Sequence, residues 1–174
     1  MTLRTSLPTD RHRILEITAA TFGPVSIDRN IDVAIGPLPS TTWVERKCHA
    51  VATECDCPEN ILVAVDSRGV VQGYASVRWD PSTRVGGIPN LAVDPQYQGS
   101  GLGRRLLESA IELLTARGAE AIRIETLEQN PIGKHLYPSL GFVEVARQIH
   151  YVVRVAPPTR DATGPVAGNA SPPV

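Results

Sequence analysis

Strand-like hydrophobic patterns occupy four stretches in the first half of the chain. A short strand is predicted at residues 3–6, and Ile61–Val65 is a nearly continuous apolar run rich in β-branched residues. A polar turn joins this run to a second apolar stretch at residues 70–79, which predicts a hairpin. Another polar turn leads into a further strand, predicted at Val85–Val93.

Helical periodicity is found between these strands. The first helix is predicted to begin after Asp10, because apolar residues then repeat along one face until residues 23–24 stop it with Gly-Pro. Residues 40–42, Ser-Thr-Thr, are suited to cap a second helix that extends to about residue 52. Residues 25–39 show no clean period, so we expect a loop there with a short helical piece at most.

The second half begins with an amphipathic pattern. From Leu102, apolar residues recur on one helical face, and Gly118 is suited to end that helix in a left-handed conformation. A strand is predicted at residues 121–126. A further helix is predicted to start at Asn130-Pro131, since proline is favoured in the first helical turn.

The C-terminal region divides in two by composition. Alternating apolar residues predict two final antiparallel strands at residues 142–146 and 148–155. Residues 156–174 consist mainly of Pro, Gly, Ala, Thr and Ser and cannot bury enough apolar surface to order themselves. The sequence therefore predicts one folded domain at residues 1–155 and a flexible tail at residues 156–174.

Composition narrows the possible partners. The 174 residues are 42% hydrophobic and 20% charged, which is ordinary for a globular protein of one domain. A net charge of −1 without a long basic block gives no reason to expect nucleic acid as a partner. No apolar stretch approaches the length of a membrane span and no secretory signal is recognisable, so a cytoplasmic protein with no membrane partner is expected.

Three cysteines raise the question of a metal. Cys48 and His49 with Cys55 and Cys57 can be imagined as four ligands, but they lack the usual CxxC spacing of structural zinc sites. Reduced thiols that serve as small or half-buried residues are the better interpretation, and no metal is expected.

Residues 98–103, QGSGLG, carry the most informative chemistry. They lie between the strand that ends at Val93 and the amphipathic helix that follows. A helix start leaves several backbone N–H groups unpaired, with the positive end of the helix dipole behind them, and this favours an anion such as phosphate. Glycines let a ligand oxygen approach the main chain closely. A turn whose glycines serve packing alone is the alternative.

The spacing of this run excludes two familiar phosphate loops. A P-loop needs a Lys-Ser or Lys-Thr pair after its glycines, and a Rossmann loop needs GxGxxG with an acidic residue about 20 positions later. The pattern here is instead QxxGxG at Gln98, Gly101 and Gly103. It resembles the acetyl-CoA pyrophosphate loop of the GNAT superfamily of N-acetyltransferases.

A second segment carries the same resemblance. After the loop helix, GNAT domains have a strand, an Asn-started helix with a tyrosine, and then Gly-Phe. This chain has residues 121–126, Asn130, Tyr137 and Gly141-Phe142 in that order. The match covers roughly residues 86–155, whereas residues 1–85 agree in the order of elements alone.

The resemblance implies a fold and a set of site residues. The fold is an α/β (α+β) GNAT domain with a mixed, mostly antiparallel sheet of about seven strands and about four helices. Strand residues 90–93 would splay from residues 123–126, so that main-chain groups of Leu91 and Val93 hold the acetyl oxygen and the pantetheine amides. The implied cofactor-binding residues are Leu91, Ala92, Val93, Gln98, Gly99, Ser100, Gly101, Leu102, Gly103, Arg104 and Asn130.

Tyr137 is the implied catalytic residue. A phenol with an ordinary pKa of about 10 is protonated at neutral pH and can donate that proton to a departing thiolate. A tyrosine packed on the last strands is the structural alternative. Some family members carry a glutamate base at a position that falls near Gly87, which has no side chain. Glu125, Asn90 or a chain of waters can each be considered for taking the proton of the amine.

We therefore expect an acyltransferase that moves the acetyl group of acetyl-CoA directly to a primary amine of a small molecule or peptide. A non-catalytic acyl-CoA sensor or partner module is the alternative from another class, and a different acyl-CoA donor is a third possibility. The sequence does not choose the acceptor, because acceptor specificity lies in variable segments such as residues 25–57. It is compatible with a monomer or a homodimer.

Overall fold

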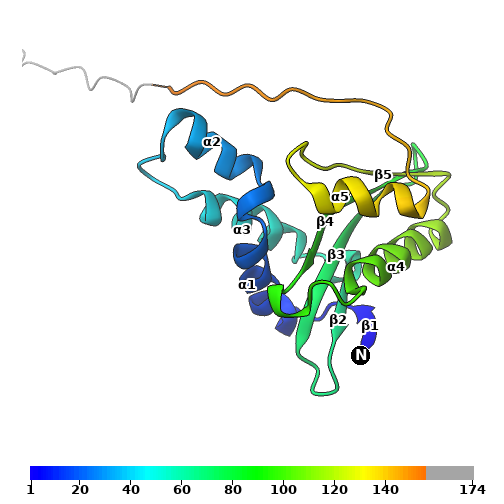
Figure 1. The fold of residues 1–174 in the computed structure, drawn as a ribbon. Helices are drawn as coiled ribbons and strands as arrows, with labels where there is room; N and C mark the ends of the chain where they lie inside the picture. The colour runs from blue at the N-terminus through cyan, green and yellow to red at the C-terminus, as the bar shows by residue number, and fades with distance from the viewer. Residues whose placement is uncertain (156–174) are drawn as a thin grey trace, which may run out of the picture.

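A five-stranded sheet organises the part of the chain that the computed structural model describes, residues 1–155 (Figure 1). The strands follow one another across the sheet in chain order. They are β1 (Thr2–Thr5), β2 (Ile61–Val65), β3 (Val71–Asp80), β4 (Val85–Val93) and β5 (Ala121–Ile124). The first four strands pair antiparallel, while β4 and β5 pair in parallel because a helix crosses between them. The sheet is thus mixed and mostly antiparallel, as predicted.

Helices cover both faces of this sheet. They are α1 (Arg11–Thr21), α2 (Ile27–Ile35), α3 (Trp43–Glu54), α4 (Leu102–Ala116) and α5 (Pro131–Leu136). Helices α1 and α3 pack together on one face, and α4 packs on the other against β2, β3 and β4. None of the helices in the described part of the chain combines the length and apolar character needed to span a bilayer.

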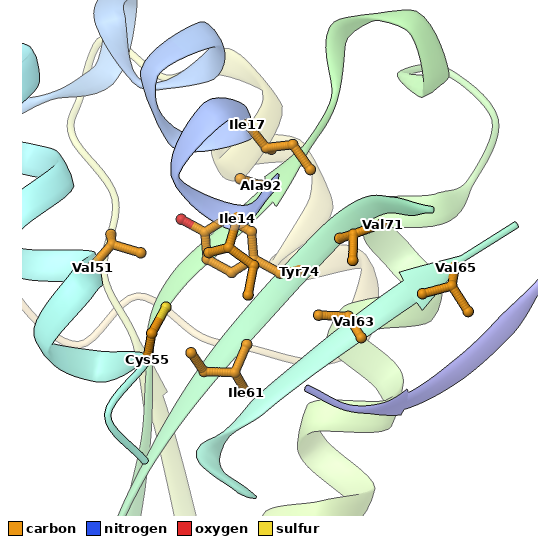
Figure 2. Packing of buried hydrophobic residues seen from close by; sticks show 10 residues of the cluster. All are labelled: Ile14, Ile17, Val51, Cys55, Ile61, Val63, Val65, Val71, Tyr74 and Ala92. Carbon is orange, nitrogen blue, oxygen red and sulfur yellow. The ribbon is translucent and has the colours of Figure 1, made fainter. Parts of the chain in front are cut away.

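The sheet separates two hydrophobic cores. In the core shared with α1 and α3, the fully buried Tyr74 ring lies among Ile14, Val51 and Cys55 (Figure 2). The Tyr74 hydroxyl lies 2.7 Å from the Thr18 hydroxyl, so the buried phenol is satisfied. The second core is built from the apolar face of α4 that the sequence predicts, and its members include Leu102, Leu106, Leu107, Ala110 and Leu114.

Helix α2 corrects the prediction of a loop at residues 25–39. Its nine residues begin after Ser26, whose side chain accepts a hydrogen bond from the Asp28 amide, and end at Gly36 with φ of 79°. The Gly-Pro and Pro residues that suggested a loop lie just beyond the helix. With α2 included, the described residues hold five helices of this type instead of about four.

The prediction of about seven strands is also wrong for the described residues. Residues 142–155 are extended but pair with no other strand within residues 1–155, so the sheet has five strands. This segment runs past α5 toward α2 (Figure 1). There the Arg154 guanidinium donates to the carbonyls of Ile35, Gly36 and Pro37, at distances of 2.5–3.2 Å. Contacts at the end of α2 therefore take the place of strand pairing beside β5. The predicted tail, residues 156–174, lies outside the described residues.

Candidate functional site

A β-bulge divides β4 into two halves. Ser76 pairs with Asn90 and Arg78 pairs with Gly87, so three steps along β4 match two steps along β3. The extra residue lies at Ile88-Pro89, and proline is tolerated at bulges because no ladder hydrogen bond is needed from it. The bulge shifts the alternation of side chains by one residue between the two halves of the strand.

Beyond the bulge, β4 has a partner on one side only. Its parallel pairing with β5 ends at Ile88, which is matched with Ile124, while its antiparallel pairing with β3 continues to Val93. The strands β4 and β5 therefore separate after Ile88. This is the splay that the sequence comparison with GNAT domains predicted for residues 90–93.

The peptide groups of Leu91 and Val93 face this gap. In an antiparallel ladder, alternate residues direct both of their backbone groups to the same neighbour. The Asp94 amide donates to the Gln72 carbonyl of the β3 side at 2.9 Å, so residues 90, 92 and 94 are turned toward β3 and Leu91 and Val93 are turned away. The Gln98 side chain donates to the Val93 carbonyl at 3.0 Å from the open side. Ala92 presents no peptide group to the gap, and its side chain is buried in the core.

The glycine run forms an open turn between β4 and α4. Asp94 is buried, pairs with Arg13 and caps a 3₁₀ turn by accepting from the Gln96 amide at 2.9 Å. Gly99 and Gly101 have φ of 75° and 81°, a conformation that favours glycine, and a Cβ at either position would meet no atom within 4 Å. The main chain of this turn is therefore accessible to a ligand.

The start of α4 lies beside the end of α5. Gly101 is the N-cap residue, and no side chain of residues 1–155 caps this helix start. A Cβ at Gly103 would lie 3.8 Å from Val93 and 4.0 Å from Leu136, so the first turn of α4 fits between β4 and α5. Arg104 donates to the Ser139 hydroxyl at 2.6 Å, and Ser100 donates to the Tyr97 carbonyl at 2.6 Å. The amides of Leu102, Gly103 and Arg104 belong to the first turn, where intrahelical partners are missing.

Tyr137 directly follows Leu136, whose side chain lies near the first turn of α4. It is the C-cap residue of α5, and its ring meets Phe142 edge to face with centroids 6.2 Å apart. Burial raises the pKa of the Tyr137 phenol above its usual value, and a hydrogen bond with Thr126 opposes part of that rise. The phenol is therefore protonated at neutral pH, and Tyr137 packs against the second core together with Leu136 and Leu140.

Asn130 caps the N-terminus of α5. Its side-chain oxygen accepts from the Gly133 amide at 3.2 Å, and its amide nitrogen donates to the Thr126 hydroxyl at 2.8 Å. This is the capping role that the sequence suggested beside cofactor contact. Thr126 thus links Asn130 to Tyr137 across the end of the β5 segment.

A buried polar network on the opposite face was missed by sequence reasoning. The Lys47 ammonium donates to the Asn90 side-chain oxygen at 2.6 Å and lies 4.1 Å from the centre of the Phe22 ring. The Asn90 side-chain nitrogen donates to Glu54 at 2.7 Å and to the Ser76 hydroxyl at 3.3 Å. Desolvation lowers the pKa of Lys47, and the Glu54 charge opposes this effect. Lys47 and Glu54 lie seven residues apart on α3, and that spacing alone gave no sign of Asn90.

Glu54 extends this network to a cavity on the surface of the sheet. The Arg78 guanidinium donates to Glu54 at 2.9 Å, and the Arg78 side chain is 72% exposed. Arg78, Gly87, Pro89, Arg123 and Glu125 are among the residues that line a cavity of about 540 Å³ beside the point where β4 and β5 separate. The candidate bases Glu125 and Asn90 are thus placed differently: Glu125 lines the cavity, and the Asn90 carboxamide is held in the buried network.

Known proteins resemble this chain in sequence. The sequence model of the acetyltransferase (GNAT) family matches residues 33–142. The [ribosomal protein bS18]-alanine N-acetyltransferase of Escherichia coli (strain K12) is 45% identical over 122 residues, which are 66% of this chain and 80% of that protein. The N-alpha-acetyltransferase RimI of Mycobacterium tuberculosis is 34% identical over 105 residues, which are 56% of this chain and 61% of that protein.

Solved structures give the same fold. The PaiA N-acetyltransferase from Thermoplasma acidophilum, solved in complex with coenzyme A, superposes with a TM-score of 0.63 at 18% identity, covering 82% of this chain and 89% of that one. Together with the match to more than half of the sequence, this shows that the chain belongs to the acetyltransferase (GNAT) family. It is an N-acetyltransferase that uses acetyl-CoA as co-substrate and an amine as acceptor, and the named relatives favour an enzyme over a non-catalytic sensor.

Proposed function

We propose that acetyl-CoA is held along the open side of β4 and that its acetyl group passes directly to the α-amine of a peptide or protein. The observation that carries this proposal is the orientation of Leu91 and Val93, whose peptide groups face the gap between β4 and β5. An extended pantetheine arm can pair with such groups as an added strand does. A backbone N–H aimed at the carbonyl oxygen of the thioester would stabilise the negative charge that develops there.

The glycine turn is proposed to hold the phosphates. Its support is the accessible main chain at Gly99 and Gly101 and the uncapped start of α4, whose dipole favours an anion. Gln98, Ser100, Leu102, Gly103 and Arg104 complete this proposed binding segment. In the proposed complex, the Arg104 guanidinium at Ser139 would carry positive charge close to the phosphates. Asn130 is proposed to contact the pantetheine arm with the part of its amide that capping leaves free.

Tyr137 is proposed to protonate the thiolate of coenzyme A as it departs. Support comes from its position directly after Leu136, which lies near Gly103 in the first turn of α4, and from burial, which raises the pKa of the phenol and keeps it protonated. The acceptor amine must lose a proton as it attacks. Glu125 lines the cavity at the splay and is exposed, so it can take this proton directly or through water, although a chain of waters alone would serve as well.

The acceptor class is supported by two observations. The relatives named above are an alanine N-acetyltransferase of ribosomal protein bS18 and an N-alpha-acetyltransferase, and both names point to an amine of a protein or peptide. The cavity beside the splay is open on the face of the sheet that carries α3, and it offers backbone and side chains to an extended peptide. A small amine would use less of this surface.

Calorimetric titration with acetyl-CoA, followed by thiol release against peptides and small amines, tests the proposal. We expect binding of acetyl-CoA and thiol release that depends on a peptide with a free N-terminus. An N-terminally blocked peptide is the matched control and should release no thiol. Release with small amines alone would contradict the peptide acceptor, and failure to bind acetyl-CoA would contradict the whole proposal.

A further inference from the structure

Gly87 forms the floor of the cavity beside the splay. It pairs with Arg78 of β3 on one side and with Arg123 of β5 on the other, so the two arginines flank a residue without a side chain. A Cβ at Gly87 would have Arg78 Cβ as its nearest contact, at 4.0 Å. Paired residues in adjacent strands point to the same face of a sheet, and all three residues line the cavity.

The charged side chains around Gly87 differ in whether they already have hydrogen-bond or ion-pair partners. Asp80 accepts from the amide and the hydroxyl of Ser82 and is thereby used in its own turn. Arg78 has one ion pair, with Glu54, and its side chain is 72% exposed. Arg123 forms no ion pair with any residue in the range 1–155 and is exposed. Two arginine side chains with donors to spare therefore lie on the same face of the sheet, one on each side of Gly87.

Glu125 provides a negative charge nearer to the proposed position of acetyl transfer than the two arginines are. It follows Arg123 by two residues, beyond the last matched pair of β4 and β5, and it lines the same cavity. A molecule that enters the cavity thus meets a carboxylate at the splay and two arginine side chains two residues closer to the start of β4. This order suits an acceptor whose amine lies at the splay and whose negative charge follows it.

We propose that the preferred acceptor carries a carboxylate within its first three residues, bound between Arg78 and Arg123 over Gly87. The inference rests on the proposed peptide acceptor. Gly87 precedes Leu91 by four positions including the bulge, which is roughly 10 Å of strand at about 3.3 Å per residue, and an extended peptide spans that distance in three residues. Guanidinium and carboxylate groups form paired, charge-assisted hydrogen bonds, which select a carboxylate over its neutral amide.

The polar network between α3 and β4 positions the Arg78 side chain. Glu54 holds the Arg78 guanidinium, Asn90 holds Glu54, and Lys47 holds Asn90. Glu54 is 16% exposed, so this chain of contacts starts at the surface and continues into the buried space between α3 and β4. Arg78 is therefore held by Glu54, whereas Arg123 is exposed and has no ion pair within residues 1–155, so its side chain can turn toward a ligand.

Peptides that differ at one position test this proposal. In one set of three, glutamate, glutamine or lysine directly follows the N-terminal alanine, and in a second set of three it stands at the third position; the rest of the sequence is identical and neutral. We expect kcat/KM to be about tenfold higher for the glutamate peptide than for the glutamine peptide, in line with the greater strength of charge-assisted hydrogen bonds. The lysine peptide should be the poorest. Equal values for the glutamate and glutamine peptides would overturn the proposal.

Variants assign the effect to the two arginines. Arg123→Gln should lower kcat/KM for the glutamate peptide toward that for the glutamine peptide, and Arg123→Glu should reverse the preference in favour of lysine. Arg105→Gln removes an exposed arginine on α4 and is the matched control, which should retain the preference. A preference for glutamate that persists in Arg123→Glu would overturn the proposal. Bound acetyl-CoA without acetylation of any of these peptides would overturn the peptide acceptor itself.

Discussion

The half of β4 at Leu91 and Val93 presents peptide groups to the site, whereas the half at Gly87 presents an open floor between side chains of β3 and β5. The first half is continuous with the glycine turn, so its function can be inferred from one short stretch of sequence. The second half gains its chemistry from residues brought together from three strands and α3. In the proposed complex, co-substrate recognition is thus local in the chain, and acceptor recognition is assembled by the fold.

The sharpest test of the co-substrate side is Tyr137→Phe. We expect kcat to fall by about 100-fold, because a positioned general acid contributes roughly 10²–10⁴ to the rate. The dissociation constant of acetyl-CoA should change little, since the ring and its contact with Phe142 remain. Steady-state kinetics and calorimetry separate the two quantities. Tyr97→Phe, which removes another half-buried hydroxyl near the glycine turn, is the control; retained activity in Tyr137→Phe would remove the proposed role.

Gly101→Val should give the next largest effect. Gly101 has φ of 81°, and a left-handed conformation costs a residue with a Cβ about 1–2 kcal/mol. The turn would have to shift, so we expect acetyl-CoA to bind about tenfold more weakly or worse, measured by calorimetry.

Gly69 provides a matched control for that substitution. It also has φ of 81° and no atom within 4 Å of an added Cβ, but it lies in the turn between β2 and β3. Gly69→Val should therefore carry a similar backbone strain without a change in acetyl-CoA affinity. Equal loss of affinity in both variants would mean that strain alone, and not the glycine turn, determines binding.

Gly87→Val tests the acceptor side with a smaller expected effect. An added side chain would occupy the open floor, so KM for the peptide should rise several-fold while acetyl-CoA affinity is unchanged. Gly86→Val is the matched comparison, because Gly86 is the neighbouring residue of the same strand but faces α4. A Cβ at Gly86 would lie 2.9 Å from Leu114. We expect Gly86→Val to lower the free energy of unfolding by about 1–3 kcal/mol, as overpacking does. Similar stability of the two variants would contradict the conclusion that Gly86 faces α4 and Gly87 faces the open cavity.

The pH dependence should show the smallest effect. Burial raises the pKa of Tyr137, so the protonated phenol persists above its ordinary range and is lost only when the pH passes that raised pKa. We expect kcat to show no decrease from this group between pH 7 and about pH 10, the ordinary pKa of tyrosine. A decrease below pH 9 that disappears in Tyr137→Phe would contradict the direction of the shift.

The sequence predicted those features that depend on neighbouring residues in the chain, such as turns and helix caps. The glycines at positions 99 and 101 take the positive φ that their residue type allows, and Asn130 caps α5 as its position before Pro131 suggested. The separation of β4 from β5 was predicted from family resemblance, since no local signal at residues 90–93 indicates where a partner strand ends. The roles proposed for these residues remain predictions.

Long-range contacts explain what the sequence could not give. Alternation at residues 142–155 predicts strands, but Arg154 is fixed at the end of α2, a contact between positions more than 100 residues apart. The contacts of Lys47 and Glu54 with Asn90 join residues from α3 to β4 over 36 to 43 positions. Helix α2 was missed for a different reason: the Pro and Gly residues just after Ile35 weighed against a helix that they in fact terminate.

The bulge at Ile88-Pro89 determines which residues of β4 face each side of the sheet beyond it. Before it, Gly86 and Ile88 face α4, and after it Leu91 and Val93 do. In a regular strand of the same length the second half would be turned over, so that Asn90 would face the α4 core and the peptide groups now turned to β3 would face the gap. A substitution at Pro89 that keeps the bulge changes one contact, but a substitution that abolished the bulge would exchange the two sides of the strand. The conformation of this short stretch is therefore more tightly constrained than its composition.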